Sequence, residues 1–359
     1  MVIVRFTILS FNFRPEWIFL FRTKNAESVL LTLIPLRKKE VIIVSVSHQS
    51  SAAKEGRLVR LGKDIYKHKQ KYLLILPGLA WYIVFAYIPI YGLTLAFKNF
   101  RANLGIFRSP WVGMIHFENL LLDPAFMESI YTTLRINTGR LIFVFPVPIL
   151  IALFFNEIRL RRSKKILQSI FTFPHFLSWV IVSSIMINVL GHNGLVNSIG
   201  SIFGADPISF LGSPTLFRPM VYITDIWKSA GWSAIIYMAA ISGIDTEQYE
   251  AAEIDGAGRL QRMIYITLPG IKATIIVLFI LAVGHLMSGG FEQIFNLSNP
   301  ATIRVAEILD MYIYRITFQG SVDFSFSAAV ALIRSFMNLG LLLFANVVIK
   351  RVSGSGLLA

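Results

Sequence analysis

Glu250–Pro269 reads EAAEIDGAGRLQRMIYITLP, and this stretch decides how the rest of the chain is interpreted. It is rich in charged residues, yet it lies between two apolar runs at roughly 219–241 and 271–293. An apolar run of about 18 residues or more is long enough to cross a bilayer. A polar segment between two such runs therefore lies at a membrane surface.

The composition agrees with a membrane protein. Of the 359 residues, 55% are hydrophobic and 15% are charged, whereas a soluble domain has about 25% charged residues. Cysteine is absent, which excludes disulfides, Cys-ligated zinc and thiol catalysis. The six histidines are scattered without a metal-binding spacing. We expect no metal, no cofactor and no catalytic residue.

Apolar stretches from Tyr72 onward predict an all-α integral membrane protein with six spans, which together form a transmembrane domain over 72–349. The predicted spans are 72–97, 132–155, 166–190, 219–241, 271–293 and 324–349. Pro77 and Pro89 lie in the first span, and Pro146 lies in the second, where proline disturbs a regular helix.

Residues 1–55 mix short apolar runs with charged residues, and no run is long enough to span a bilayer. One interpretation is a membrane-surface anchor. The other, which we favour, is a disordered tail or a translation start upstream of the true one. Residues 56–71 form a basic cytoplasmic segment, and 350–359 form a cytoplasmic tail.

The net charge of +14 is concentrated beside the spans. The clusters are Arg57, Arg60, Lys63, Lys67, Lys69 and Lys71; Arg159, Arg161, Arg162, Lys164 and Lys165; and Lys350 with Arg351. The positive-inside rule places the first two clusters in the cytoplasm, and the six spans then alternate in direction. Both termini and the Glu250 segment are then cytoplasmic, and the connections 98–131, 191–218 and 294–323 lie outside. This explains the basic charge better than nucleic-acid binding does.

The loop 244–270 is predicted to form a short surface helix, a turn and a second helix. Asp245 is a good N-cap, and Gln248 three residues later completes a capping box. Gly256 supplies a stop, and the second helix, Arg259–Leu268, ends before Pro269. Such a rigid helix with small residues can enter a groove on a partner and carry its motion into the fourth and fifth spans.

Glu250–Pro269 fits the pattern E-A-A, three residues, G, nine residues, I-x-L-P. This pattern resembles the cytoplasmic coupling loop of ABC importer permeases. Other stretches resemble the carbohydrate branch of these permeases, with the type I fold, and within it the LplB-like polygalacturonan or aldouronate group of Gram-positive bacteria. They are Ser109–Gly113, Phe173–Trp179, Asp225–Trp232, Gly243–Ala252, Phe291–Ile294 and Tyr312–Arg315.

The resemblance implies ATP-driven import of a carbohydrate, an oligosaccharide that can contain uronate, across a bacterial plasma membrane. It implies a pore shared with a second homologous permease subunit, two ABC ATPase subunits and an extracellular lipid-anchored solute-binding protein. The chain has no G-x-x-x-x-G-K-[ST] pattern, so ATP binds elsewhere and the chain is not an enzyme. The implied ATPase-coupling residues are Glu250, Ala251, Ala252, Asp255, Gly256, Ile266, Leu268 and Pro269.

Polar residues inside spans are costly and usually face the bundle or a cavity, and aromatic rings suit stacking on sugars. The candidate solute-pathway residues are Asp225, Trp227, Lys228, Trp232, Tyr237, Glu292, Gln293, Arg334 and Asn338; the second span also carries Arg135, Asn137 and Arg140.

Each pathway candidate has an alternative role. Asp225 and Lys228, three residues apart, are expected to pair with each other. Trp232 can be an interfacial anchor, and the Glu292–Gln293 pair can simply be solvated near the outer surface. Arg334 can hold an acidic sugar or pair with the second permease.

Three rival functions stay open. One is an ABC permease for a non-sugar solute, against which the Trp-containing fourth span argues. Another is a secondary transporter driven by an ion gradient, which would need no coupling loop. The third is a membrane enzyme, for which the sequence offers neither G-x-S-x-G nor a metal-binding spacing.

Overall fold

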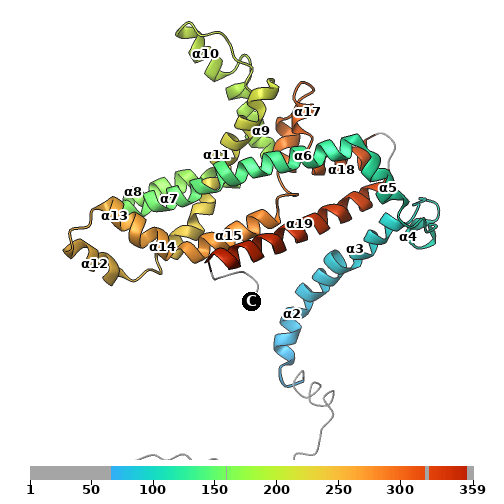
Figure 1. The fold of residues 1–359 in the computed structure, drawn as a ribbon, viewed down its shortest axis with the longest axis horizontal. Helices are drawn as coiled ribbons and strands as arrows, with labels where there is room; N and C mark the ends of the chain where they lie inside the picture. Colours follow the sequence, from blue (N-terminus) through green and yellow to red (C-terminus); the bar gives the residue numbers. More distant parts are fainter. Residues whose placement is uncertain (1–65, 159, 320–322, 354–359) are drawn as a thin grey trace, which may run out of the picture. The chain divides into compact units, whose positions relative to one another are not determined.

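The computed structural model describes residues 66–158, 160–319 and 323–353, and the regular secondary structure of this part of the chain consists of helices, with one isolated β-bridge between Lys98 and Trp111 (Figure 1). The expected extension 1–55, most of the basic segment 56–71 and the end of the tail 350–359 lie outside the described residues. The described residues up to Trp81 and those from Tyr82 onward belong to two separate units.

The first apolar segment is α2 (Lys69–Tyr82), a π turn (Ile83–Tyr87), α3 (Ile88–Ile90) and a 3-10 helix (Tyr91–Phe97). It is followed by α4 (Gly105–Arg108), α5 (Ile115–Leu122), α6 (Pro124–Gly139), a π turn (Arg140–Val144), α7 (Pro146–Glu157), α8 (Arg161–Thr172), a 3-10 helix (Phe173–Phe176), α9 (Trp179–Leu190) and α10 (Leu195–Ile202).

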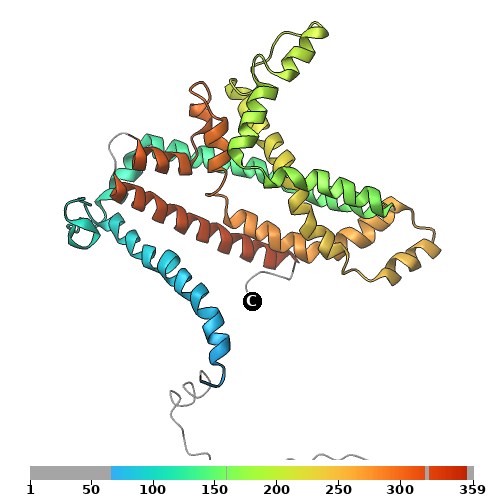
Figure 2. The ribbon, with the colours of Figure 1, turned by 180° about the vertical axis from the view of Figure 1, so that it is seen from behind.

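The second half begins with α11 (Pro214–Ile241), and the loop after it contains α12 (Thr246–Ile254), α13 (Arg259–Arg262), a π turn (Met263–Thr267) and α14 (Leu268–Gly270). The remaining helices are α15 (Lys272–Gly284), α16 (Phe291–Leu297), α17 (Ile303–Ala306), α18 (Leu309–Phe318) and α19 (Phe324–Ser353). Figures 1 and 2 show α11 lying along α7, and α15 along α19.

Each of the three π turns ends two residues before a proline: Pro89, Pro146 or Pro269. A proline has no N–H, and its ring clashes with the carbonyl four residues earlier. One extra residue in the preceding turn moves that carbonyl aside, which is how the chain keeps a continuous helix through these prolines. At Pro146, for example, Phe145 N–H donates to the Arg140 carbonyl, five residues back, at 2.9 Å.

Four of the described helical segments are long and apolar enough to cross a membrane: Lys69–Phe97, Pro124–Glu157, Trp179–Ile202 and Phe324–Arg351. A fifth is the pair Arg259–Gly270 and Lys272–Gly284, which bends by 60°. The 28-residue α11 has a spanning length but carries several charged residues, which lower its hydropathy.

Two of the predicted spans are not continuous helices. The span 166–190 is interrupted after Phe176, and α9 starts anew with the Ser178 side chain accepting from Ile181 N–H. The span 271–293 ends at Gly284, because Gly289 and Gly290 take φ values of 97° and 87°. That left-handed backbone favours glycine, and it separates α15 from α16.

The helix α11 takes part in two hydrophobic clusters. Near its start, Phe217 and Val221 pack with Ile136 of α6. Near its end, Ala234 and Tyr237 pack with Ala152 of α7. The α6–α7 segment and α11 therefore run in the same direction along each other.

Candidate functional site in the coupling loop and the polar centre

The helix α12 is fixed at both ends by local contacts. Asp245 accepts a hydrogen bond from Glu247 N–H at 3.0 Å, so the predicted N-cap is confirmed. The exposed Gln248 makes no hydrogen bond within the described part of the chain, so the predicted capping box is wrong. At the other end Gly256 has φ 79° and allows its N–H to reach the Glu253 carbonyl at 3.1 Å, a turn that suits glycine.

The second arm of the loop supports α12 from one side. Arg262 pairs with Glu253 at 2.8 Å, and the hydroxyls of Tyr249 and Thr267 are 2.9 Å apart. At the base of the loop, a Cβ on Gly270 would lie 2.6 Å from Ile244 Cδ1. Because the arms touch so closely, α12 and the α13–α14 arm are joined as one body.

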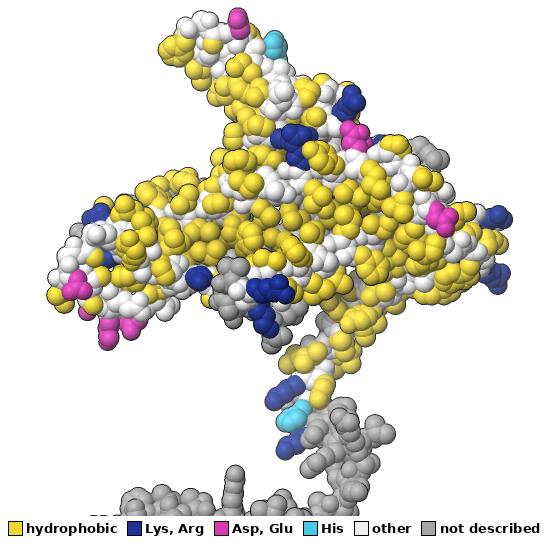
Figure 3. Space-filling model, viewed as in Figure 1, with side chains coloured by type: hydrophobic (Ala, Val, Ile, Leu, Met, Phe, Trp, Pro, Cys, Tyr) yellow, Lys and Arg dark blue, Asp and Glu magenta, His cyan; other side chains and the backbone are white. Residues whose placement is uncertain are grey.

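No described residue of the chain covers the opposite face of α12. Glu247, Glu250, Ala251 and Ile254 are spaced three and four residues apart, which places them on one helical face, and all four are exposed. Ile254 is 86% exposed, and Figure 3 shows acidic side chains gathered over α12. A helix face with exposed carboxylates around an exposed isoleucine suits a partner protein with a basic, partly apolar groove.

The remaining predicted coupling residues lie in the same loop. Asp255, Gly256, Leu268 and Pro269 are exposed, and Ala252 and Ile266 are partly buried.

The predicted pair of Asp225 with Lys228 is wrong. Asp225 instead lies 3.2 Å from Nε of Arg140, and both side chains are less than a fifth exposed, at 18% and 16%. Lys228 donates to the His175 carbonyl at 2.8 Å, which is available because the helix is interrupted there, and it lies 5.4 Å from the centre of the Trp179 ring. Spacing on one helix allowed a local pair, but the neighbouring helices offer each charge a better partner.

Arg140 connects three helices through its other nitrogens. It donates to Asn137 Oδ1 at 2.9 Å and to Gln293 Oε1 at 2.5 Å. Gln293 in turn donates to Thr224 Oγ1 and to the Val221 carbonyl of α11, at 2.8 and 2.7 Å. The alternative of a solvated Gln293 is therefore wrong, since it is 1% exposed; Glu292 beside it is exposed.

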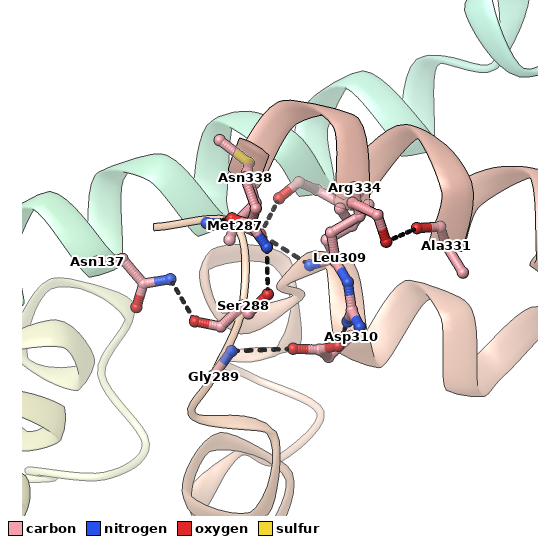
Figure 4. Close-up of polar contacts among 12 residues, drawn as sticks. Asn137, Met287, Ser288, Gly289, Leu309, Asp310, Ala331, Arg334 and Asn338 are labelled. Carbon is pink, nitrogen blue, oxygen red and sulfur yellow. Dashed lines mark hydrogen bonds and ion pairs between the residues drawn. The ribbon is translucent and has the colours of Figure 1, made fainter. Parts of the chain in front are cut away.

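The turn between α15 and α16 is held by polar side chains from other helices (Figure 4). Asn338 accepts from Met287 N–H at 2.9 Å and donates to Ser288 Oγ at 2.6 Å. Asn137 donates to the Leu286 carbonyl at 2.7 Å, and Gly289 N–H donates to Asp310 at 3.2 Å. These contacts fix the turn beside Arg140, next to a cavity of about 250 Å³.

Arg334, the candidate for an acidic sugar, forms an ion pair with Asp310 of the same chain (Figure 4). Its charge is thus compensated without a solute or a second permease. This pair could not be expected from the sequence, because Asp310 lies in a connection that was predicted outside the membrane.

The aromatic candidates separate into two groups. Trp227 and Trp232 are 42% and 43% exposed, and Trp232 stacks on His175 with ring centres 4.6 Å apart. Tyr237 is 2% exposed inside a hydrophobic cluster, so its ring offers no open face within this chain.

Arg140 and Asn137 are central to the site but were only noted in passing from the sequence. The signal was available, because a charged residue inside an apolar span needs a partner. Ser288 and Thr224 gave no comparable signal, since small hydroxyl residues are common in membrane helices.

The family described as "Binding-protein-dependent transport system inner membrane component" matches residues 145–354. The polygalacturonan/rhamnogalacturonan transport system permease protein YteP of Bacillus subtilis is 41% identical, over 85% of this chain and 95% of that protein. Protein LplB of the same organism is 40% identical, over 81% and 92%.

A solved structure has a similar fold. It is a bacterial ABC transporter involved in the import of the acidic polysaccharide alginate, with a TM-score of 0.75 and 38% identity over 82% of this chain and 99% of that chain. A second structure, of a bacterial alginate ABC transporter in complex with an alginate pentasaccharide-bound periplasmic protein, also has a TM-score of 0.75, at 37% identity.

Proposed function

This chain belongs to the binding-protein-dependent transport system inner membrane components, and from that premise we propose that it forms half of the pore of an ATP-driven carbohydrate importer. The observation that carries the proposal is the exposed acidic and apolar face of α12, in a loop whose two arms contact each other. The names of the relatives, which include polygalacturonan, alginate and an alginate pentasaccharide, support a polysaccharide or an oligosaccharide derived from it as the solute.

Both helices that leave the coupling loop lead to the polar centre. The helix α11 carries Asp225, the partner of Arg140, and α15 ends at the turn held by Asn137 and Asn338. A movement of α12, driven by ATP binding to another subunit, would therefore reach the polar centre by two rigid routes. Such coupling between a docking site and a two-state pore is how this class of transporter would alternate its access.

The proposed assembly contains this chain, a second homologous permease, two ABC ATPase subunits that hydrolyse the ATP, and an extracellular lipid-anchored solute-binding protein. The last is supported by the complex of the alginate transporter with a periplasmic protein. In a bacterial plasma membrane, Lys350 and Arg351 at the end of α19 favour a cytoplasmic C-terminus. The N-terminus would lie on the same side, before the 72–349 domain.

The test reconstitutes the complete transporter in proteoliposomes and measures ATP-dependent uptake of labelled oligogalacturonates and malto-oligosaccharides. Glu250→Lys reverses the charge of the docking face, and Gly256→Pro cannot adopt φ 79°. We expect both variants to lose uptake while their amounts in the membrane stay normal. Glu118→Lys, an exposed charge on α5, is the matched control and keeps uptake.

Normal uptake by both loop variants would refute the coupling role. Uptake driven by an ion gradient without ATP, or no uptake of either sugar class by the wild type, would refute the carbohydrate-importer proposal itself.

A further inference from the structure

Arg135 of α6 and Arg218 of α11 have no compensating charge among the described residues. Arg140 is paired with Asp225, and Arg334 with Asp310. For Arg135 and Arg218, in contrast, no hydrogen bond or ion pair is found among residues 66–158, 160–319 and 323–353, and Nε of Arg218 is buried without a partner. Arg135 is exposed and Arg218 is partly buried. A buried donor such as Nε of Arg218 usually has a partner, so its missing partner is expected from outside the chain.

These two arginines lie at the same level on neighbouring helices. The Tyr222 hydroxyl of α11 packs against Gly139 of α6 so closely that a Cβ there would lie 2.0 Å away. Arg135 precedes Gly139 by four residues, and Arg218 precedes Tyr222 by four, which is about one turn on each of two helices that run in the same direction. The charge of Arg135 accordingly acts on Arg218, and both act on Tyr222.

The surroundings of the two arginines favour binding of an anionic solute that enters from the outer side. Figure 3 shows a group of basic side chains over α6 near its crossing with α11. Tyr131, one turn earlier on α6, is 62% exposed and adds an aromatic face. By the positive-inside orientation, this end of α6 and α11 is the extracellular end, where a solute released by a binding protein would enter.

We propose that Arg135 and Arg218 form a carboxylate-binding subsite at the outer mouth of the pathway, selecting uronate-containing oligosaccharides over neutral ones. The proposal rests on the proposed function. Two guanidinium groups side by side repel each other in the absence of an anion, and they match the planar geometry of a carboxylate when one is present. The adjoining Tyr131 ring then supports the sugar face.

The binding of trigalacturonate, and of its methyl ester, which lacks the charge, tests this directly. Both sugars are measured by equilibrium dialysis on the complete permease–ATPase complex in nanodiscs without the solute-binding protein, so that selection by that protein does not enter. We expect the wild type to bind the acid about tenfold more tightly than the ester, as one charge-assisted contact allows. Arg135→Gln and Arg218→Gln should each weaken binding of the acid about tenfold and leave the ester unchanged.

Three comparisons keep the test decisive. Arg108→Gln removes an exposed charge from α4 and should change neither affinity. Arg218→Lys keeps a charge and should recover part of the affinity for the acid. Equal affinities of the wild type for the acid and the ester would overturn the proposed subsite. It would also be overturned if the variants bound both sugars equally weakly and the second permease were lost from the purified complex. That result would assign the two arginines to the interface with the second permease. Either result can occur with ATP-dependent uptake intact, so the proposed function would stand separately.

Discussion

The pair of Arg140 and Asp225 should contribute measurably to the stability of the bundle. Their charged atoms are 3.2 Å apart, and Arg140 Nε makes no hydrogen bond, so this contact is held by charge. Removing one partner of a buried pair costs about 3–5 kcal/mol, and the remaining exposure of both side chains favours the lower end. We expect Arg140→Gln to reduce the free energy of unfolding by about 3 kcal/mol.

Asp225→Asn should cost less, about 2 kcal/mol, because Arg140 keeps its hydrogen bonds to Asn137 and Gln293. The double variant should lose at least about 1 kcal/mol less free energy of unfolding than the two single losses added together, as expected for residues in contact. The assay is unfolding in mixed detergent micelles, with Asp206→Asn, an exposed carboxylate, as the control. Losses that add within about 0.5 kcal/mol would refute a direct coupling of the pair.

Three further predictions concern other contacts. Gly256→Ala forces φ 79° on a residue with a Cβ, so it should lower stability by about 1–2 kcal/mol and reduce uptake; unchanged melting would contradict this. Gly270→Val would collide with Ile244, so uptake should fall and Ile244→Ala should partly restore it. Burial and the hydrogen bond to Asp123 at 2.5 Å raise the pKa of Tyr312, so the folded state keeps this proton when the unfolded state loses it. The free energy of unfolding should therefore decrease as the pH rises above about 10, and Tyr312→Phe should remove that pH dependence between pH 9 and 11.

The coupling loop could be predicted from the sequence because its determinants are local. An N-cap acts within two or three residues, and a glycine stop acts at its own position. Asp245 and Gly256 therefore showed their roles directly. The exposed face of α12 followed from the helical period of the same short segment.

The polar centre could not be predicted in the same way, because its partners are distant along the chain. The spacing rule that paired Asp225 with Lys228 considers one helix at a time. Arg140 reaches Asp225 and Gln293 only because a π turn and the glycine turn at Gly289 bring three helices together. These backbone irregularities are difficult to predict from the sequence. A proline or glycine indicates that a helix is interrupted, but it does not determine the direction in which the chain continues.

The π turn at Arg140–Val144 rotates the side chains of one half of a membrane segment, about the helix axis, relative to those of the other half. One added residue rotates the following side chains by about 100° relative to a regular helix. Thr133 and Asn137 can thus face the Leu309 and Leu286 backbones, while the half after Pro146 lies along α11. Deleting one residue from this turn would turn the first half away from its partners, and chimaeras between relatives should be joined outside it.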